Sequence, residues 1–499
     1  MDQVPVRAGA ALGLAGILVI MLLVSTTQVA PASAGQNQQS ITTGPISPVV
    51  DLLSLDGEAR QSLFSSLAVV SYTNSVFIPS IARNYGGPAG PFAVQLYGSI
   101  SASSGFTHAA AAGAPWIRFP VRWSEIEPGN TIPPDYNWGA LDASIQEAMA
   151  AGMQLVLTIE SNPTWAAALS SGPVYNLDDL KEFVGAVVAR YPDVTYWEMY
   201  NEPDNVLGAF GNQGAAYAAM LNAVYPVIDS ANPAALVVMG GVAMDWFEDQ
   251  NGTFDREFVD DVLRACIKPC FDVANFHYYP VFRGKWEQYG RDIIGKATYL
   301  RQRLALYGYD RPVINTETGW TYSDVWGSPA LQARYVPKTY VRGIAADLAI
   351  ISWYAMLDAD PSLPGLLGGS YPSFTLRPSY QAFQRLISLL GRARYVRALS
   401  VTETDSPFIE GYVFSVPWLP TAKRIDVVWF DCPSLQVDTP DLPVDCSNSA
   451  LYSIPVSQIG IMDHLTGALM FRTDGDDGEF DGRVTISVNT NPIYIDYDP

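Results

Sequence analysis

Histidine and cysteine are scarce in this 499-residue chain, which contains three histidines and four cysteines. So few histidines argue against a histidine-rich metal site. Four cysteines fit an oxidising compartment, where Cys266 and Cys270 flank a short loop and Cys432 and Cys446 bracket a loop rich in Pro and Asp. Local pairing within each couple is the simplest of three connectivities. A tetrathiolate zinc site is the alternative, but neither couple has the usual two-residue spacing.

Positive charge is also in short supply. Lys and Arg number 29 against 50 Asp and Glu, which gives a formal net charge of −21. Such a surface repels nucleic acids and anionic membranes, so we expect neither as a partner. An acidic balance suits a secreted protein that must stay soluble, and it equally suits a salty or acidic habitat. With 48% hydrophobic residues the chain buries a large core, and it is too long for one compact domain.

Long uncharged apolar runs are absent except at the N-terminus, where one run extends from Ala8 to Val24. Arg7 precedes this run and Ala32-Ser33-Ala34 follows it, which predicts a secretory signal peptide over residues 1–34. An uncleaved membrane anchor is the alternative, because the run is long for a signal core and short for a typical span. We therefore expect a secreted protein, or one tethered to a membrane through this segment. Residues 35–90 are expected to form a flexible linker followed by a stretch that the pattern does not assign.

A regular alternation of short apolar strands and amphipathic helices begins at residue 91. The expected strands are Phe92–Tyr97, Trp116–Phe119, Leu155–Ile159, Val194–Met199, Leu236–Met239, Phe271–Phe276, Pro312–Thr316 and Ala349–Tyr354. Helical patterns separate them, and the last helix is expected at Tyr380–Leu390. Eight strand–helix units in about 300 residues predict an α/β fold, a (β/α)8 TIM barrel, over residues 91–393.

The texture changes after Arg394. Short β runs separated by loops of Pro, Asp and Gly replace the strand–helix alternation. This pattern predicts a small C-terminal all-β sandwich domain over residues 394–499.

Polar side chains gather at the carboxyl ends of the expected barrel strands, which is where TIM barrels carry their chemistry. Asn201 and Glu202 follow the fourth strand, which stops before Pro203, and Glu317 follows the seventh. Strands four and seven face each other across a barrel, so these two glutamates are the candidate catalytic residues. The other candidates, for substrate binding, are Arg118, Glu160, Asn201, His277, Tyr279, Trp320 and Trp353.

Two facing carboxyl groups suit glycoside hydrolysis, which needs an acid at the leaving oxygen and a carboxylate on the other face of the sugar. Arg118 and Tyr279 are expected to hydrogen-bond Glu317 and keep it ionised, while a less stabilised Glu202 keeps a raised pKa. Exposed rings of Trp320 and Trp353 are expected to stack on the sugar.

Each of these residues alone has an ordinary structural explanation. Arg118 fits a structural ion pair, His277 a satisfied histidine at the barrel rim, and Trp353 the core. Their joint placement at strand ends favours a functional site.

Two motifs resemble those of clan A glycoside hydrolases: Trp-Glu-Met-Tyr-Asn-Glu-Pro-Asp at 197–204 and Asn-Thr-Glu-Thr-Gly-Trp at 315–320. Within that clan the chain is most similar to family 39 and its relatives, with family 5 next. The resemblance implies Glu202 as acid/base, Glu317 as nucleophile, Asn201 as a contact of the sugar 2-hydroxyl, Tyr279 as partner of the nucleophile, and Arg118 as its orienter. Family 5 enzymes usually carry a histidine after strand three, where this chain has Glu160-Ser161-Asn162.

These observations together predict a retaining glycosidase that acts on β-linked oligosaccharides or polysaccharides and uses no cofactor and no metal. A transglycosylase that uses the same two carboxyl groups is one alternative. A non-catalytic carbohydrate-binding barrel is another, although such a barrel has no need to keep both glutamates.

Overall fold

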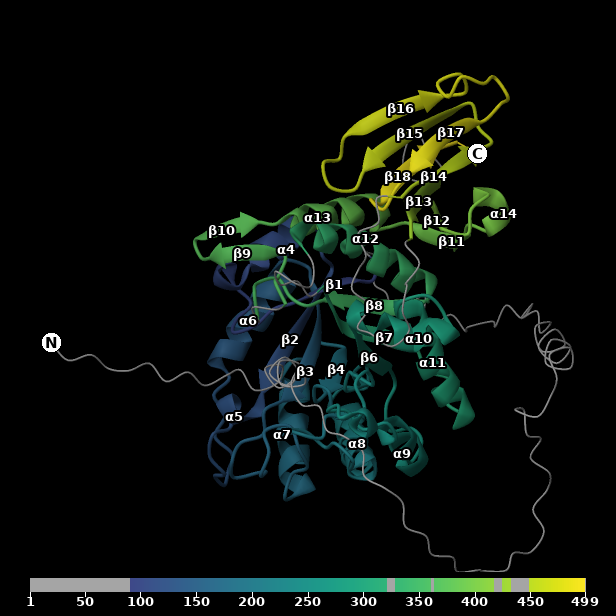
Figure 1. Cartoon of the computed structure of the whole chain (residues 1–499). Coiled ribbons are helices and arrows are strands. Elements are labelled where there is room, and N and C mark those ends of the chain that lie inside the picture. The colour runs from purple at the N-terminus through teal and green to yellow at the C-terminus, as the bar shows by residue number, and fades with distance from the viewer. Residues whose placement is uncertain (1–89, 321–327, 360–362, 417–423, 432–447, 499) are drawn as a thin grey trace, which may run out of the picture. The chain divides into compact units, whose positions relative to one another are not determined.

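The computed structural model describes residues 90–320, 328–359, 363–416, 424–431 and 448–498 (Figure 1). The expected signal segment, nearly all of the expected linker, and Cys432 and Cys446 lie outside the described residues. The two predictions made for those parts, cleavage after Ala34 and a Cys432–Cys446 bridge, therefore stay predictions.

The central feature is one sheet of eight parallel strands. They are β1 (Phe92–Gln95), β2 (Trp116–Arg122), β3 (Gln154–Glu160), β4 (Tyr196–Met199), β5 (Leu236–Met239), β6 (Ala274–Tyr278), β7 (Val313–Thr318) and β8 (Leu348–Trp353). Neighbouring strands pair in the order β5-β4-β3-β2-β1-β8-β7-β6. Parallel bridges between Val238 and Val273 and between Val242 and Phe276 join the two ends of this order. The predicted TIM barrel is confirmed.

Helices connect the strands and surround the barrel (Figure 1). The longer ones are α4 (Phe106–Ala112), α6 (Gly139–Ala150), α7 (Leu177–Arg190), α8 (Gly214–Ala231), α9 (Phe258–Ala265), α11 (Ile293–Leu306), α12 (Pro329–Ala345) and α13 (Pro378–Leu390). Helix α7 shows why they form: Asn176 caps the backbone N–H of Asp178, acidic residues occupy the first turn, and Arg190 ends it. Its apolar stripe is buried, as the 3.6-residue period predicts.

The structure also contains elements that the sequence pattern did not indicate. A two-stranded hairpin of β9 (Leu367–Ser370) and β10 (Ser373–Leu376) lies between β8 and α13. Strand β2 runs to Arg122, three residues past its expected end. It continues through Pro120 because β1 stops pairing at Gln95, whereas β3 pairs with β2 as far as Glu160.

In the described residues after α13, the chain forms only strands and loops apart from one short helix, α14 (Val401–Thr404). Its strands are β11 (Arg394–Ala398), β12 (Ile409–Ser415), β13 (Arg424–Phe430), β14 (Ala450–Ile454), β15 (Gln458–Asp463), β16 (Leu469–Thr473), β17 (Val484–Val488) and β18 (Ile493–Tyr497). Six of them form an antiparallel sheet in the order β11-β12-β13-β18-β15-β16, and β14 pairs with β17. A second hydrophobic core lies between these sheets, as expected for a sandwich.

Buried ion pairs connect α12 to this all-β part. The guanidinium of Arg342 on α12 donates to both carboxylate oxygens of Glu410 on β12, at 2.9 and 2.6 Å. It also donates to Asp292, at the start of α11, and to Asp431 at 3.1 Å, just after β13. The side chains of this cluster are at most 8% exposed. Charges this deeply buried stay charged only when they are paired.

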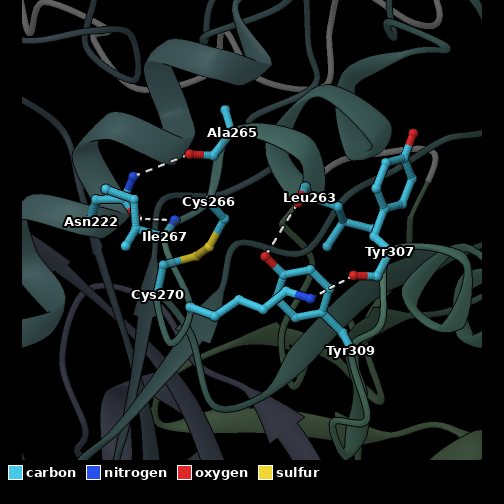
Figure 2. The surroundings of a disulfide bond; sticks show 9 residues. Asn222, Leu263, Ala265, Cys266, Ile267, Cys270, Tyr307 and Tyr309 are labelled. Carbon is cyan, nitrogen blue, oxygen red and sulfur yellow. Dashed lines mark hydrogen bonds between the residues drawn. A yellow bond between two sulfur atoms is a disulfide. The ribbon is translucent and has the colours of Figure 1, made fainter.

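A disulfide closes the loop after α9. Cys266 is bonded to Cys270, as the sequence predicts (Figure 2). The same loop is fastened at Ile267, whose N–H donates to the Asn222 side chain at 2.8 Å. No helix in the described ranges combines the length and the apolar character that a membrane crossing requires.

Candidate active site

The interior of the barrel is built in layers. Side chains alternate between the inside and the outside of a barrel strand, so residues two apart on a strand share a face. One buried apolar cluster contains one residue from each strand, except that the residue for β6 lies immediately before it. The members are Ala93, Trp116, Val156, Tyr196, Val238, Val273, Ile314 and Ile350. This layer closes the lower part of the barrel.

The next layer towards the carboxyl ends is almost entirely polar. Two residues beyond each member of the apolar layer stand Gln95, Arg118, Thr158, Glu198, Gly240, Asn275, Thr316 and Ser352. All of the polar members are buried, with exposed fractions of 2% or less. The polar side chains of this layer hydrogen-bond to one another, except that of Ser352, so the layer forms a hydrogen-bonded floor beneath the mouth of the barrel.

Arg118 is the centre of that floor. Its guanidinium donates to Glu198 at 2.8 and 3.0 Å, to Asn201 at 2.7 Å, to Gln95 at 3.2 Å and to Glu317 at 3.3 Å. The expectation that Arg118 ends its strand is wrong, since it lies in the middle of β2. Its expected contact with Glu317 is present. Arg118 thus ties the acidic residue of the floor to two residues at the ends of β4 and β7.

Glu317 lies near the end of β7 with both carboxylate oxygens engaged. The Tyr279 hydroxyl donates to Oε1 at 2.7 Å, and Arg118 reaches Oε2. Burial nevertheless raises the pKa of Glu317 above its ordinary value, and the charge of Glu202 raises it too; the Arg118 charge and the Tyr279 hydrogen bond oppose this rise. The expected donors are therefore present, but they limit the effect of burial on the pKa rather than reverse it.

Glu202 faces Glu317 from the end of β4. One oxygen of each carboxylate and a ring nitrogen of His277 lie within 4.8 Å of one another. Burial, reinforced by the charge of Asp245, raises the pKa of Glu202 to about 7. Glu202 has a φ of +42°, and Tyr200, two residues earlier, has a φ of +64°. Residues other than glycine hold such angles at a cost, and they concentrate at functional sites.

His277 links Glu202 to the floor. Its Nδ1 is 3.1 Å from Oε1 of Glu202, and its Nε2 is 3.2 Å from the Thr316 hydroxyl. That hydroxyl has a closer, charged acceptor in Glu198, at 3.0 Å. We therefore assign the Thr316 hydroxyl as a hydrogen-bond donor to Glu198, and we place the imidazole proton on Nε2. Nδ1 is then left to accept a hydrogen bond from the carboxyl group of Glu202.

The titration of His277 agrees with this assignment. Burial lowers the pKa of His277 to about 4, so the ring is neutral. A neutral ring with its proton on Nε2 has one acceptor, Nδ1, and this atom faces Glu202. This assignment and the raised pKa of Glu202 both fit a carboxyl group that keeps its proton up to about neutral pH.

A buried ion pair that no sequence motif indicates also acts on Glu202. Lys296 on α11 donates to Asp245, just after β5, at 2.7 Å, and also to the Ala243 carbonyl. The Trp286 indole donates to the same Asp245 oxygen at 3.0 Å. Both charges act on Glu202: Asp245 raises its pKa and Lys296 lowers it. Nothing in the spacing of these residues connects them to Glu202.

The predicted tryptophans do not present exposed rings. Trp353 is 0% exposed and Trp320 is 7% exposed. Both pack on Tyr335 of α12, with ring centroids 6.4 and 4.7 Å away. The expectation that these rings lie open for a sugar is therefore wrong, because they fill the layer between the barrel and α12.

Two tyrosines lie two residues beyond Gln95 and Ser352, just past the carboxyl ends of β1 and β8. Tyr354 is 5% exposed, so its ring is as buried as that of Trp320. Tyr97 and Tyr354 are in edge-to-face contact with centroids 5.7 Å apart. Burial raises the pKa of each, and the charge of Glu317 raises it further. Neither tyrosine belongs to a motif, although counting every second residue from the apolar layer leads to both.

Glu198 was not among the predicted site residues either, and the same count identifies it. It is 0% exposed and accepts hydrogen bonds from Thr158 at 2.6 Å, Asn275 at 2.9 Å and the Gly241 N–H at 3.1 Å, besides those from Arg118. Despite burial, the charge and hydrogen bonds of Arg118, together with the hydrogen bond from Thr158, hold the pKa of Glu198 below its usual range. A charged residue inside an apolar strand requires a buried partner. The glutamate within the apolar strand Tyr196–Met199 was therefore the feature of the sequence that indicated a buried polar cluster.

The trio of Glu202, His277 and Glu317 has the composition of a metal site, but its contacts do not suit one. Both oxygens of Glu317 already accept hydrogen bonds, one of them from a guanidinium. A cation beside that guanidinium is electrostatically disfavoured. The arrangement fits two carboxyl groups in different protonation states.

Comparisons with known proteins agree with this geometry. A family model described as cellulase (glycosyl hydrolase family 5) matches residues 84–353, which is 270 of the 499 residues. A search of curated proteins returns no match. A family 39 glycoside hydrolase from Bacteroides cellulosilyticus WH2, a gut symbiont, is similar in structure at 17% identity, with a TM-score of 0.61 over 82% of this chain and 81% of that chain.

Two further solved structures share the fold. One is a monomeric β-xylosidase from Caulobacter crescentus CB15, at 14% identity and a TM-score of 0.55, covering 82% of this chain and 97% of that chain. The other is a family 30 endoxylanase from Clostridium papyrosolvens C71, at 12% identity and a TM-score of 0.53, covering 83% and 98%. The predicted resemblance to clan A is confirmed, and the family model favours family 5 where the motifs placed family 39 first. With a family match over more than half of its length, the chain belongs to glycosyl hydrolase family 5, the cellulase family.

Proposed function

We propose that this protein is a secreted retaining glycosidase that cleaves β-glycosidic bonds by double displacement, with Glu202 as acid/base and Glu317 as nucleophile. The observation that carries this proposal is the short distance between the two carboxyl groups, which have oxygens within 4.8 Å of one another. Retaining enzymes hold their carboxyl groups about 5–5.5 Å apart, whereas inverting enzymes leave about 6.5–9.5 Å for a water molecule.

The surroundings of each carboxyl group support its role. In the first step Glu317 attacks the anomeric carbon while Glu202 gives its proton to the leaving oxygen, and a covalent sugar ester forms. In the second step Glu202 takes a proton from water, the water oxygen attacks the same carbon, and Glu317 leaves as a carboxylate. Glu202 has the raised pKa and the acceptor nitrogen that a waiting acid needs, and Glu317 has two donors that fix its direction of attack.

The substrate is proposed to be a β-linked oligosaccharide or polysaccharide. The matching family is described as cellulase, and two of the similar structures are a β-xylosidase and an endoxylanase. Aryl β-glucosides, β-cellobiosides and β-xylosides are therefore the first substrates to assay. The same assays with an added acceptor sugar distinguish hydrolysis from transglycosylation.

Azide separates the two roles. Glu202→Ala is expected to form the ester from a substrate with a good leaving group and then to stall, so that azide releases a glycosyl azide of retained configuration. Glu317→Gly forms no ester, so azide attacks the substrate directly and gives the inverted product. The configuration of the azides, read by NMR, checks both. Exchanged configurations reverse the assignment, and near-native turnover by both variants refutes the proposal.

Secretion rests on the N-terminal segment, which lies outside the described residues. The apolar run from Ala8 to Val24 and the small residues at 32–34 support cleavage after Ala34. N-terminal sequencing of protein from the culture medium should begin at Gly35. Recovery of the whole chain, Met1 included, in the membrane fraction favours the anchor instead.

A further inference from the structure

Glu160 stands at the mouth of the barrel in a position that the proposed mechanism does not use. It is the last residue of β3, two residues beyond Thr158. The Thr158 hydroxyl donates to Glu198 in the floor, so the side chain of Thr158 points into the barrel. Because side chains two apart share a face, Glu160 lies on the same inward face, one layer nearer the opening.

The carboxylate of Glu160 has no hydrogen-bond partner or ion-pair contact among the described residues. The basic residue opposite it in the β2–β3 register is Arg122, and the Arg122 guanidinium is directed to Glu125 instead, at 3.3 Å. Arg118, the other nearby cation, is held by Glu198. Glu160 is only partly exposed, and burial raises its pKa although both arginines oppose this. A half-buried carboxylate without a hydrogen-bond partner costs folding free energy, unless a bound ligand donates hydrogen bonds to it.

The backbone beneath Glu160 is held firmly. Ser161 has a φ of +62°, and its carbonyl accepts the N–H of Ser124 at 2.8 Å. The next residue, Asn162, accepts the Tyr200 hydroxyl at 2.6 Å and donates to two carbonyls of its own loop. The hydrogen bonds of Ser161 and Asn162 thus hold this strained turn in place. They fix the position of Glu160, as a ligand-binding group requires.

The charges around the opening limit what Glu160 can bind. The two buried cations near the site are shared among three carboxylates, Arg118 between Glu198 and Glu317 and Lys296 with Asp245. Glu160 adds a further carboxylate at the mouth of the barrel that none of these cations pairs with. A carboxylate accepts hydrogen bonds from sugar hydroxyl groups, often two at once, and it repels a second carboxylate.

We propose that Glu160 is a specificity-determining residue that binds hydroxyl groups of an uncharged sugar unit and excludes units carrying a carboxylate, such as uronic acids. This inference rests on the proposed glycosidase function and names the class of sugar unit that the site accepts. It assigns Glu160 to binding and not to bond cleavage.

Glu160→Gln tests the proposal, because it keeps the shape of the side chain and removes the charge. The substrates are 4-nitrophenyl β-glucoside and β-xyloside as neutral sugars and 4-nitrophenyl β-glucuronide as the acidic one. We expect Glu160→Gln to lose roughly 10- to 100-fold in kcat/KM on the neutral glycosides. The glucuronide is expected to lose nothing or to gain, so the neutral-to-acidic ratio falls by at least about tenfold.

Asp249→Asn is the matched control, since it removes a carboxylate that is 54% exposed and paired with Arg256. It should keep the wild-type ratio. Glu160→Asp, which withdraws the carboxylate by one methylene group, should give an intermediate ratio, and thermal midpoints of all variants report whether they fold. If Glu160→Gln unfolds, the ratio of the Glu160→Asp variant decides alone.

An unchanged ratio in the folded Glu160 variants overturns the inference. A wild-type preference for an aryl β-glucosaminide over the glucoside, lost in Glu160→Gln, also overturns it, because the carboxylate then binds an ammonium group. Failure of the proposed function looks different. In that case wild-type protein cleaves no aryl β-glycoside, or Glu317→Gly remains active, whatever Glu160 does.

Discussion

The guanidinium of Arg118 donates to both carboxylate oxygens of Glu198, from Nε at 2.8 Å and from Nη2 at 3.0 Å, inside the barrel and out of contact with solvent. The same guanidinium reaches Glu317 and Asn201. Glu198 thus fixes the group that orients the proposed nucleophile. The polar floor of the barrel is in this way connected directly to the chemistry at its mouth.

Arg118→Lys should reduce kcat/KM by about 100-fold, because an ammonium group cannot donate to Glu198, Asn201 and Glu317 with one fixed fork, and the nucleophile loses its orientation. Steady-state kinetics on an aryl glycoside measure the loss. Arg190→Lys is the matched control, since Arg190 makes a similar two-bond contact with Asp142 at 2.8 and 2.6 Å on the exposed surface. Equal activity of both variants and wild type would show that the fork has no catalytic importance.

Asp245→Asn should move the basic limb of the kcat/KM profile to lower pH. Glu202 acts as an acid only while protonated, and its pKa of about 7 places that limb near neutrality. The charge of Asp245 raises this pKa, so its removal lowers it, by on the order of half a pH unit or more. The other groups acting on the site are Arg118, Asp204, His277, Tyr279, Lys296, Glu317 and Tyr354, and the variant leaves them in place.

The pH profiles of wild type and variant, recorded under identical salt, measure this shift. Asp249→Asn provides the control, because Asp249 is 54% exposed and paired with Arg256 in the same loop. Its profile should coincide with that of wild type. A basic limb that stays in place in Asp245→Asn, or moves to higher pH, contradicts the prediction.

Glu202→Gln should stabilise the fold above neutral pH. The folded pKa of about 7 lies above the ordinary value of 4.5, so the folded state holds the proton that the unfolded state has already lost. This group therefore costs stability progressively as pH rises from about 4.5 to 7, by about 1–3 kcal/mol in full. Thermal midpoints should favour the variant at pH 8 and converge with wild type at pH 4. A constant difference at both pH values would refute the linkage.

Arg342→Met should destabilise the protein strongly. It leaves the carboxylates of Asp292, Glu410 and Asp431 buried without their shared guanidinium. Breaking a buried ion pair from one side costs about 3–5 kcal/mol, whereas exposed pairs are worth at most about 1 kcal/mol. Urea denaturation measures the change. Arg190→Met, at the partly exposed pair with Asp142, supplies the comparison, and a similar small loss in both variants would contradict the expected difference.

Much of the fold follows from patterns that repeat along the chain. Helix α7 illustrates this, because its cap, its charges and its apolar stripe all lie within fifteen residues and need no distant partner. The hairpin of β9 and β10 shows the opposite case. Its strands are four residues each, mostly exposed, and the Gly368-Gly369 pair in β9 has little strand preference. These two segments become strands because they hydrogen-bond to each other, and neither segment has a sequence pattern that predicts a strand.

The motifs alone pointed to Glu202 and Glu317 as the candidate catalytic pair, because an Asn-Glu-Pro after one buried strand and a glutamate at the end of another are local features that indicate the same end of a barrel. Trp320 and Trp353 were misjudged for a related reason. A sequence shows that a ring follows or ends a strand, but its exposure depends on what packs against it, and here Tyr335 of α12 does so. The two tyrosines in contact just past the ends of β1 and β8 are separated by more than 250 positions in the chain.

By itself, the sequence determined the barrel, the all-β region after it, the two glutamates and the short disulfide, because periodicity, strand ends and close cysteine spacing are properties of neighbouring residues. Only the tertiary structure decided which protonation state each glutamate is suited to. Glu202 is tuned by His277, Asp245 and Lys296, which come from three other segments, and Glu317 by Arg118 and Tyr279. Electrostatic interactions and hydrogen bonds depend on distance in space, and chain order does not contain those distances.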